Sequence, residues 1–207
     1  MLERRPEPAL MEDKDQCQYY NNEFVDYPEM LSEFIETYNK TIGMRQGNVI
    51  DIGSGSCNFV IELCKAYPQL HFTCYEASKE MIKIARKNIA KEQLENRIII
   101  IEDNFFNATG KFDLVIANRV LHHVNNTEDF WKLLNTLSTN VLVCDLGRPS
   151  TLDNFQKSFS EDLKNSFMAA YTVEEVIEQT KNYHYTIIKE MCENEFYKFI
   201  VFTNKDT

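Results

Sequence analysis

The chain has 207 residues, 43% of them hydrophobic, and a formal net charge of -10. That length suits one well-buried domain with a small elaboration. The acidic balance argues against a nucleic-acid partner, because phosphate binding needs a basic surface. No apolar run approaches transmembrane length, and the first residues lack the apolar core of a secretory signal. We therefore expect a single domain over residues 1–207 with no DNA and no membrane partner.

The cysteines and histidines give no sign of a disulfide framework or a metal site. None of the six cysteines forms a Cys-x-x-Cys pair, and several fall inside apolar runs. This is typical of reduced, buried thiols in a cytoplasmic protein. The histidines have no zinc-ligand spacing, and the adjacent His122 and His123 are poorly placed to serve one metal. We expect a cytoplasmic location and no metal.

Residues 1–45 precede the first predicted strand. Pro6 and Pro8 favour an extended start. Helices are then predicted over residues 15–24 and 29–38, the second from apolar residues at helical spacing, with Pro28 between them.

A glycine-rich turn follows the first predicted strand. The apolar run that begins at Val49 ends at Asp51, Gly53 and Gly55 follow, and helical spacing begins at Phe59. Because glycine has no Cβ, the backbone of such a turn can approach a ligand closely. An acid at the strand end suits an ammonium or hydroxyl group better than a bare phosphate. The segment therefore predicts a site for a nucleoside-bearing cofactor with a cationic tail.

Three further apolar runs also end in polar residues, at Glu76, at Glu102-Asp103 and at Asn118. We expect these residues along one edge of a parallel sheet, where open α/β folds bind ligands. A carboxylate at Glu76 could accept two hydrogen bonds from a ribose diol. The alternative is an acid that complements a helix dipole, since Ser78 is a predicted N-cap.

A fifth strand is predicted over residues 140–145. Asp145, at its carboxyl end, is expected to face a bound substrate, where it could hold an amine or deprotonate a hydroxyl. Arg148 could bind a substrate carboxylate through two hydrogen bonds. For both residues a loop salt bridge is the alternative.

The remaining residues divide into two parts. Residues 146–180 contain an aromatic segment, including Phe155 and Phe159, that is a candidate substrate lid. This part ends in a helix that begins at Thr172. Residues 181–207 alternate as two strands joined by a turn near Glu193, which predicts an antiparallel hairpin.

Four segments taken together resemble the class I S-adenosylmethionine-dependent methyltransferases, over roughly residues 48–145. They are residues 49–57 (VIDIGSGSC), 75–88 (YEASKEMIKIARKN), 101–103 (IED) and 112–124 (FDLVIANRVLHHV). The resemblance implies an α/β, Rossmann-like three-layer sandwich. It has a mostly parallel seven-stranded sheet with an antiparallel C-terminal hairpin strand. Residues 46–145 would be the cofactor-binding core, and residues 1–45 a helical cap.

The resemblance also implies roles for individual residues. In that family Asp51, Gly53 and Gly55 would line the methionine moiety, and Glu76 would hold the ribose. Met81 would lie against the adenine, Asp103 would meet its amino group, and Asn118 would sit beside the sulfonium. The full predicted cofactor set is Asp51, Gly53, Gly55, Glu76, Ala77, Met81, Asp103, Asn104, Asn118 and Tyr20. Glu102 could replace Asp103 after a one-residue register change.

Three features qualify the resemblance. Cys57 stands at the family's third glycine, and we expect it to pack as a small buried side chain. Tyr19 and Tyr20 are candidates to close over the ligand, with helix packing as the alternative. His122 and His123 are the residues best suited to accept a proton near neutrality, although a structural role is the other interpretation.

We expect an S-adenosylmethionine-dependent methyltransferase that acts on a small-molecule acceptor. Its predicted catalytic residues are Asp145, His122 and His123, and Arg148 and Tyr19 are predicted to contact substrate. The alternatives are a protein, peptide or RNA acceptor, or a non-catalytic S-adenosylmethionine-binding protein. A nicotinamide oxidoreductase is disfavoured, because Asn58 stands where the dinucleotide fingerprint needs its last glycine. The sequence determines neither the acceptor nor the oligomeric state.

Overall fold

The computed structural model describes residues 2–8, 10–26, 28–151, 160–191 and 197–203. Within these ranges seven strands form one sheet in the order β3-β2-β1-β4-β5-β7-β6. The strands are β1 (Gln46–Ile52), β2 (Gln69–Glu76), β3 (Ile98–Glu102), β4 (Leu114–Asn118), β5 (Val141–Gly147), β6 (Tyr185–Met191) and β7 (Tyr197–Thr203). Strands β1 to β5 are parallel, and β7 runs antiparallel to both of its neighbours. The predicted α/β class and the antiparallel C-terminal hairpin strand are confirmed.

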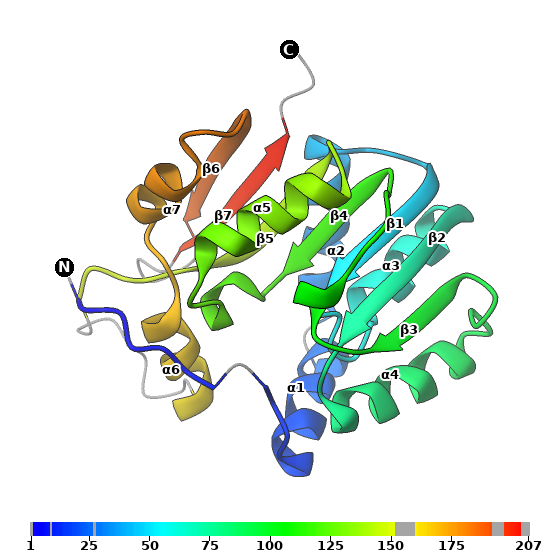
Figure 1. Cartoon of the computed structure of the whole chain (residues 1–207). Coiled ribbons are helices and arrows are strands. Elements are labelled where there is room, and N and C mark those ends of the chain that lie inside the picture. Colours follow the sequence, from blue (N-terminus) through cyan, green and yellow to red (C-terminus); the bar gives the residue numbers. More distant parts are fainter. Residues whose placement is uncertain (1, 9, 27, 152–159, 192–196, 204–207) are drawn as a thin grey trace.

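Helices cover both faces of the sheet and its carboxyl edge (Figure 1). They are α1 (Lys14–Asp26), α2 (Glu29–Thr41), α3 (Asn58–Ala66), α4 (Lys79–Lys91), α5 (Thr127–Leu137), α6 (Glu161–Ala169) and α7 (Val173–Thr180), with short 3-10 turns η1 (Phe105–Asn107) and η2 (Leu121–His123). Ser78 and Thr172 accept hydrogen bonds from backbone N–H groups in the first turns of α4 and α7. Both predicted N-caps are therefore confirmed.

Alternating apolar side chains of the central strands build a core on each face. In β1, Val49 packs with the helices α2, α3 and α4, whereas Ile50 and Ile52 pack with α5 and α7. Such alternation follows from the two-residue period of a strand. Because both faces are covered, the strands are apolar almost throughout and polar only at their ends.

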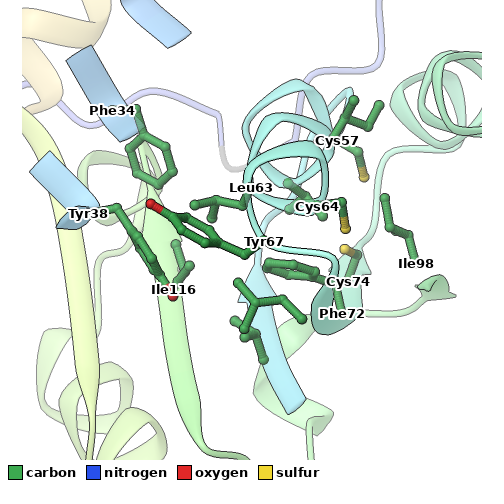
Figure 2. Packing of buried hydrophobic residues seen from close by; sticks show 14 of the residues in the cluster. Phe34, Tyr38, Cys57, Leu63, Cys64, Tyr67, Phe72, Cys74, Ile98 and Ile116 are labelled. Carbon is green, nitrogen blue, oxygen red and sulfur yellow. The ribbon is translucent and has the colours of Figure 1, made fainter. Parts of the chain in front are cut away.

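Cys57 belongs to the core on the α2–α3–α4 face. Figure 2 shows its sulfur on the same side of α3 as those of Cys64 and Cys74, with Ile98 beside them. Cys57 precedes α3 with a φ of 60°, in the left-handed region that favours glycine. Its side chain is buried. The expected packing role is therefore confirmed, and the conformation accounts for the glycine that the family has at this position.

The N-terminal segment, residues 2–8, meets α6 and η2 beyond the carboxyl ends of the parallel strands. Residues 2–8 run past α6, and α1 lies at the same end of the sheet (Figure 1). The Arg4 guanidinium donates hydrogen bonds to the carbonyl oxygens of Ala169 at 2.6 Å and His122 at 2.8 Å. The Arg5 N–H donates to the Met168 carbonyl oxygen at 2.9 Å. These bonds hold the N-terminal segment against η2 and the end of α6.

Some expectations fall on residues outside the described ranges. These are the aromatic residues Phe155 and Phe159 of the candidate lid, the hairpin turn near Glu193, and Cys192. In the described part of the chain, no helix combines the length and apolar character that a bilayer span requires.

Candidate functional site

The glycine turn after β1 lies at the carboxyl edge of the sheet and is fixed to β2. Gly53 and Gly55 have φ values of 67° and 53°. The N–H groups of Gly53 and Ser54 donate to the Tyr75 carbonyl oxygen at 2.9 and 3.1 Å. A Cβ on Gly53 would lie 2.7 Å from Val120 Cγ2. Conformation and space therefore both require glycine at position 53.

Glu76 connects this turn to the start of α4. Its Oε2 accepts from the Gly55 N–H, and its Oε1 accepts from the Ser78 N–H, both at 2.8 Å. Burial raises the pKa of the Glu76 carboxyl, and the backbone N–H donors oppose that rise. Each carboxylate oxygen has a second acceptor position. Glu76 can therefore hold the turn and still accept from a ligand hydroxyl.

Asp51 and Asn118 end the two central strands. Asp51 is only 6% exposed, and its pKa lies well above its ordinary value, because of burial and then the nearby Glu76 charge. Asn118 lines the cavity described below, and its buried Nδ2 has no hydrogen-bond partner among the described residues. Buried amide donors are normally paired. An unpaired one at a cavity wall indicates a place for a ligand acceptor atom.

One large cavity, of about 560 Å³, opens over these strand ends. From the predicted cofactor set its lining includes Gly53, Gly55, Glu76, Ala77, Met81, Asn104, Asn118 and Tyr20. Asp51 and Asp103 are not among its lining residues. Asp103 is exposed, and its Oδ1 accepts from the Asn104 N–H at 2.7 Å and Asn107 Nδ2 at 2.9 Å.

The helical segment before β1 also contributes to the lining of the cavity. Tyr19 and Tyr20 of α1 both line it, Tyr19 with 54% of its surface exposed. Burial raises the pKa of the Tyr20 phenol, and the Arg119 guanidinium to which it is hydrogen-bonded opposes that rise. The lining includes the acids Glu7, Glu23, Glu76 and Asp162, and one arginine, Arg119. The cavity is therefore predominantly acidic.

The three predicted catalytic residues form one connected group. Asp145 is 3% exposed, and its Oδ1 lies 2.6 Å from His122 Nδ1. Its Oδ2 accepts from the His122 N–H at 3.0 Å. The His122 charge and these hydrogen bonds lower the pKa of Asp145 despite its burial. Asp145 thus fixes the His122 ring from behind, while His122 and His123 line the cavity.

Glu7 is a site residue that the sequence did not single out. Its Oε1 lies 3.3 Å from His122 Nε2 and 3.4 Å from His123 Nδ1. The Ser166 hydroxyl of α6 also donates to it, at 3.0 Å. Nothing in a single sequence indicates these contacts, because Glu7 lies in a proline-rich segment more than a hundred residues before His122.

Arg148 lies away from the cavity lining. Its Nη2 is 2.5 Å from Glu175 Oε1, and its Nη1 donates to the Ala170 carbonyl oxygen at 2.8 Å. Glu175 also accepts from the Thr172 N–H in the capping box of α7. In this structure Arg148 therefore takes part in the salt bridge that was the alternative to substrate binding.

The fold and the site together define a nucleotide-cofactor enzyme domain of the α/β type. A family model described as a methyltransferase domain matches residues 45–196, and the chain belongs to this family. The predicted class, the class I S-adenosylmethionine-dependent methyltransferases, is confirmed. S-adenosylmethionine is the cofactor of that class.

Known relatives share parts of the chain. A probable (S)-tetrahydroprotoberberine N-methyltransferase 2 of Papaver bracteatum is 26% identical over 148 residues, covering 70% of this chain and 41% of that protein. A tRNA (guanine-N(7)-)-methyltransferase of Pediococcus pentosaceus is 32% identical over 81 residues, 37% of this chain and 38% of that protein. The chain thus spans less than half the length of these two relatives.

A solved structure of similar fold is the plantazolicin methyltransferase BpumL in complex with SAH. It has a TM-score of 0.67 and 17% identity, and the match covers 90% of this chain and 88% of that one. At this level of identity the similarity concerns the fold alone.

Proposed function

We propose that the protein transfers a methyl group from S-adenosylmethionine to a small-molecule acceptor. The observation that carries the proposal is the composition of this cavity. Its lining combines Gly53, Glu76 and the unpaired amide of Asn118 with His122 and His123. A cofactor and an acceptor would meet inside it.

The residues around the glycine turn fit the cofactor. Glu76 retains acceptor capacity for a ribose diol. The Asn118 amide offers a donor, and Met81 lies in the wall with Ala77. We propose Asp51, Gly53, Gly55, Asn104 and Tyr20 as the rest of the cofactor site. Asp103, with Glu102 as its alternative, is the proposed contact of the adenine amino group, and like Asp51 it lies outside the lining.

The dimensions and charge of the cavity favour a small acceptor. A volume of about 560 Å³ lies within the usual range for small-ligand sites. The acids Glu7, Glu23 and Asp162 in its wall would repel a phosphate backbone. The name of the Papaver relative gives an N-methyltransferase of a small molecule, which is consistent with this acceptor class. Tyr19 is the proposed acceptor contact from α1.

When bound, S-adenosylmethionine supplies an electrophilic methyl group on a sulfonium sulfur. The protein's main task is then to align the acceptor atom with that group. Asp145 holds His122 by Nδ1, so that Nε2 faces the cavity, and His123 lies beside it. We propose that this group takes part in removing the proton that an oxygen or nitrogen acceptor loses.

Titration calorimetry with S-adenosylhomocysteine, with NAD as the comparison ligand, tests the cofactor. Saturable binding of the first and none of the second is expected, and failure of S-adenosylhomocysteine to bind would overturn the proposal. Labelled S-adenosylmethionine with separate pools of small amines and phenols, peptides and tRNA tests the acceptor. Transfer only to tRNA or peptide would contradict a small acceptor, and binding without any transfer would indicate a non-catalytic protein.

The cellular location is also a proposal. All five cysteines of the described residues are free and buried, which favours the reducing cytoplasm. Fractionation of cells that express the full chain tests this location.

A further inference from the structure

Three potential metal-ligand atoms converge at the cavity wall. They are Glu7 Oε1, His122 Nε2 and His123 Nδ1, and all lie within 4.8 Å of one another. The histidines belong to η2, whereas Glu7 belongs to the N-terminal segment that Arg4 holds against α6. No metal-ligand spacing is visible in the sequence, because Glu7 lies more than a hundred residues before the histidines.

The two distances from Glu7 Oε1 to the histidine nitrogens match those between ligand atoms around a tetrahedral ion. Bonds of about 2.0–2.1 Å at the tetrahedral angle separate neighbouring ligand atoms by about 3.3–3.4 Å. Glu7 Oε1 lies 3.3 Å from His122 Nε2 and 3.4 Å from His123 Nδ1. The third pair, His122 Nε2 and His123 Nδ1, lies within 4.8 Å, and His123 is the most exposed of the three side chains.

The surroundings of His122 are those of a metal ligand. Asp145 Oδ1 lies 2.6 Å from Nδ1 and therefore occupies that side of the ring, and the other nitrogen, Nε2, lies 3.3 Å from Glu7 Oε1. A carboxylate behind a ligating histidine is the usual partner that fixes its tautomer and raises its basicity. Ser166 orients Glu7 in the same way, by donating to its carboxylate at 3.0 Å.

The cluster is largely buried and lies beside further oxygen atoms. His123 Nδ1 faces two oxygens, Glu7 Oε1 and the Pro8 carbonyl oxygen at 3.1 Å. Glu7 and His122 are largely buried, with side chains 14% and 5% exposed. Arg4 is close, but its guanidinium is directed at carbonyl oxygens and Asn125.

We propose that Glu7, His122 and His123 bind a divalent transition-metal ion of the Zn²⁺ class. Two imidazoles and one carboxylate suit such ions. Because all three residues line the cavity, the fourth coordination position faces the acceptor side. There the ion would lower the pKa of a bound hydroxyl or water, and it would join the N-terminal segment to the sheet.

The test uses the full chain without an affinity tag, treated with a chelator and dialysed. Zn²⁺ is titrated calorimetrically, and Co²⁺ is titrated while the visible absorption of four-coordinate Co²⁺ is recorded. One equivalent of each ion is expected to bind. Glu7→Gln and His123→Gln should abolish the strong binding, and Asp145→Asn should weaken it by about 10–100-fold.

Glu3→Gln and His184→Gln are matched controls, because both residues are exposed and lie outside the cavity lining. They should bind Zn²⁺ as the wild type does. Circular dichroism of each metal-free variant separates loss of a ligand from loss of the fold.

The proposal is overturned if the wild type binds no ion, or if folded Glu7→Gln and His123→Gln bind as tightly as the wild type. A proton shared by Glu7 and His122 would then occupy the cluster. These measurements of metal binding require no methyl transfer, so their outcome is independent of the test of the proposed function.

Discussion

Glu76 performs two tasks with one side chain. Its two oxygens accept from the N–H groups of Gly55 and Ser78, which joins the glycine turn of β1 to the N-terminus of α4. The same carboxylate lines the cavity. The sequence allowed either a ribose ligand or an acid at a helix start. The structure shows Glu76 as an acid at the start of α4. Its carboxylate oxygens still have acceptor positions for a ribose ligand.

Replacement of Glu76 should weaken the cofactor site. We expect Glu76→Ala to lower the affinity for S-adenosylhomocysteine by about 1.5–3 kcal/mol, the contribution of hydrogen bonds to a charged group. Calorimetric titration measures this change. Glu80→Ala, at a half-buried acid of the same helix that lies outside the cavity lining, is the control. Wild-type affinity in Glu76→Ala would refute its role in the site.

Asp51→Ala, which removes a buried acid outside the lining, should also weaken binding of S-adenosylhomocysteine by a similar amount.

Gly53 and Gly55 should respond differently to an added methyl group. Both have positive φ, but a Cβ at Gly53 would lie 2.7 Å from Val120 Cγ2, whereas at Gly55 its nearest neighbour would be Tyr20 Cε1 at 3.7 Å. Left-handed backbone at a non-glycine residue costs about 1–3 kcal/mol. We expect Gly55→Ala to lose about that amount of unfolding free energy and Gly53→Ala to lose more. Urea titration compares them, and Val120→Ala should restore part of the loss in Gly53→Ala only. Equal losses in the two variants would contradict the close contact.

At the scale of elements, the N-terminal segment depends on one arginine. The Arg4 guanidinium donates to the carbonyl oxygens of His122, Val124 and Ala169. Its carbon Cζ lies 4.2 Å from the centre of the Tyr171 ring. One side chain thus joins η2, α6 and the start of α7 to the segment that carries Glu7.

Removal of this guanidinium should loosen the segment. We expect Arg4→Gln to destabilise the protein by about 2–4 kcal/mol, since hydrogen bonds to a charged group contribute about 1.5–3 kcal/mol each and the freed carbonyls can regain water. It should also lose protection of the Arg5 amide, which donates to the Met168 carbonyl oxygen. Hydrogen exchange and urea titration test both effects. Arg5→Gln is the matched control, because the Arg5 side chain is exposed. Unchanged amide protection in Arg4→Gln would exclude the anchoring role.

At the scale of the whole molecule, the thiols are part of the core. Burial raises the pKa of Cys64 to about 11 and that of Cys144 to about 12, from an ordinary value of 9.0. In the unfolded chain both thiols would ionise near pH 9, while in the folded protein they stay protonated. The folded state then binds more protons, so its stability is lost as the pH rises above about 9.

Unfolding free energy should therefore fall between pH 8 and pH 10, with about 1 kcal/mol of the loss from each of these two thiols. Urea titration at the two pH values measures the change. The double variant Cys64→Ala, Cys144→Ala should be less stable at pH 8 but should lose about 2 kcal/mol less on the same pH shift. An identical pH dependence of the two proteins would show that these thiols do not contribute.

Much of the fold could be predicted because local rules govern it. The apolar runs that end in polar residues predicted β1, β2 and β4, and the caps at Ser78 and Thr172 predicted two helix starts. Most of the predicted cofactor residues line one cavity because the carboxyl ends of parallel strands meet at one edge. Arg148 could not be assigned in this way, because its partner Glu175 comes from a helix whose packing depends on the whole sheet.

The sequence by itself determined the α/β class, the glycine turn and the family, since these follow from periodicity and short-range motifs. Only the tertiary structure decided that Asp145 lies behind His122, that Arg4 holds the N-terminal segment, and that Glu7 reaches both histidines. The physical reason is that these contacts join segments distant along the chain. They form only when the packed sheet brings its carboxyl edge, α6 and the N-terminal segment together, and single-sequence patterns do not record that arrangement.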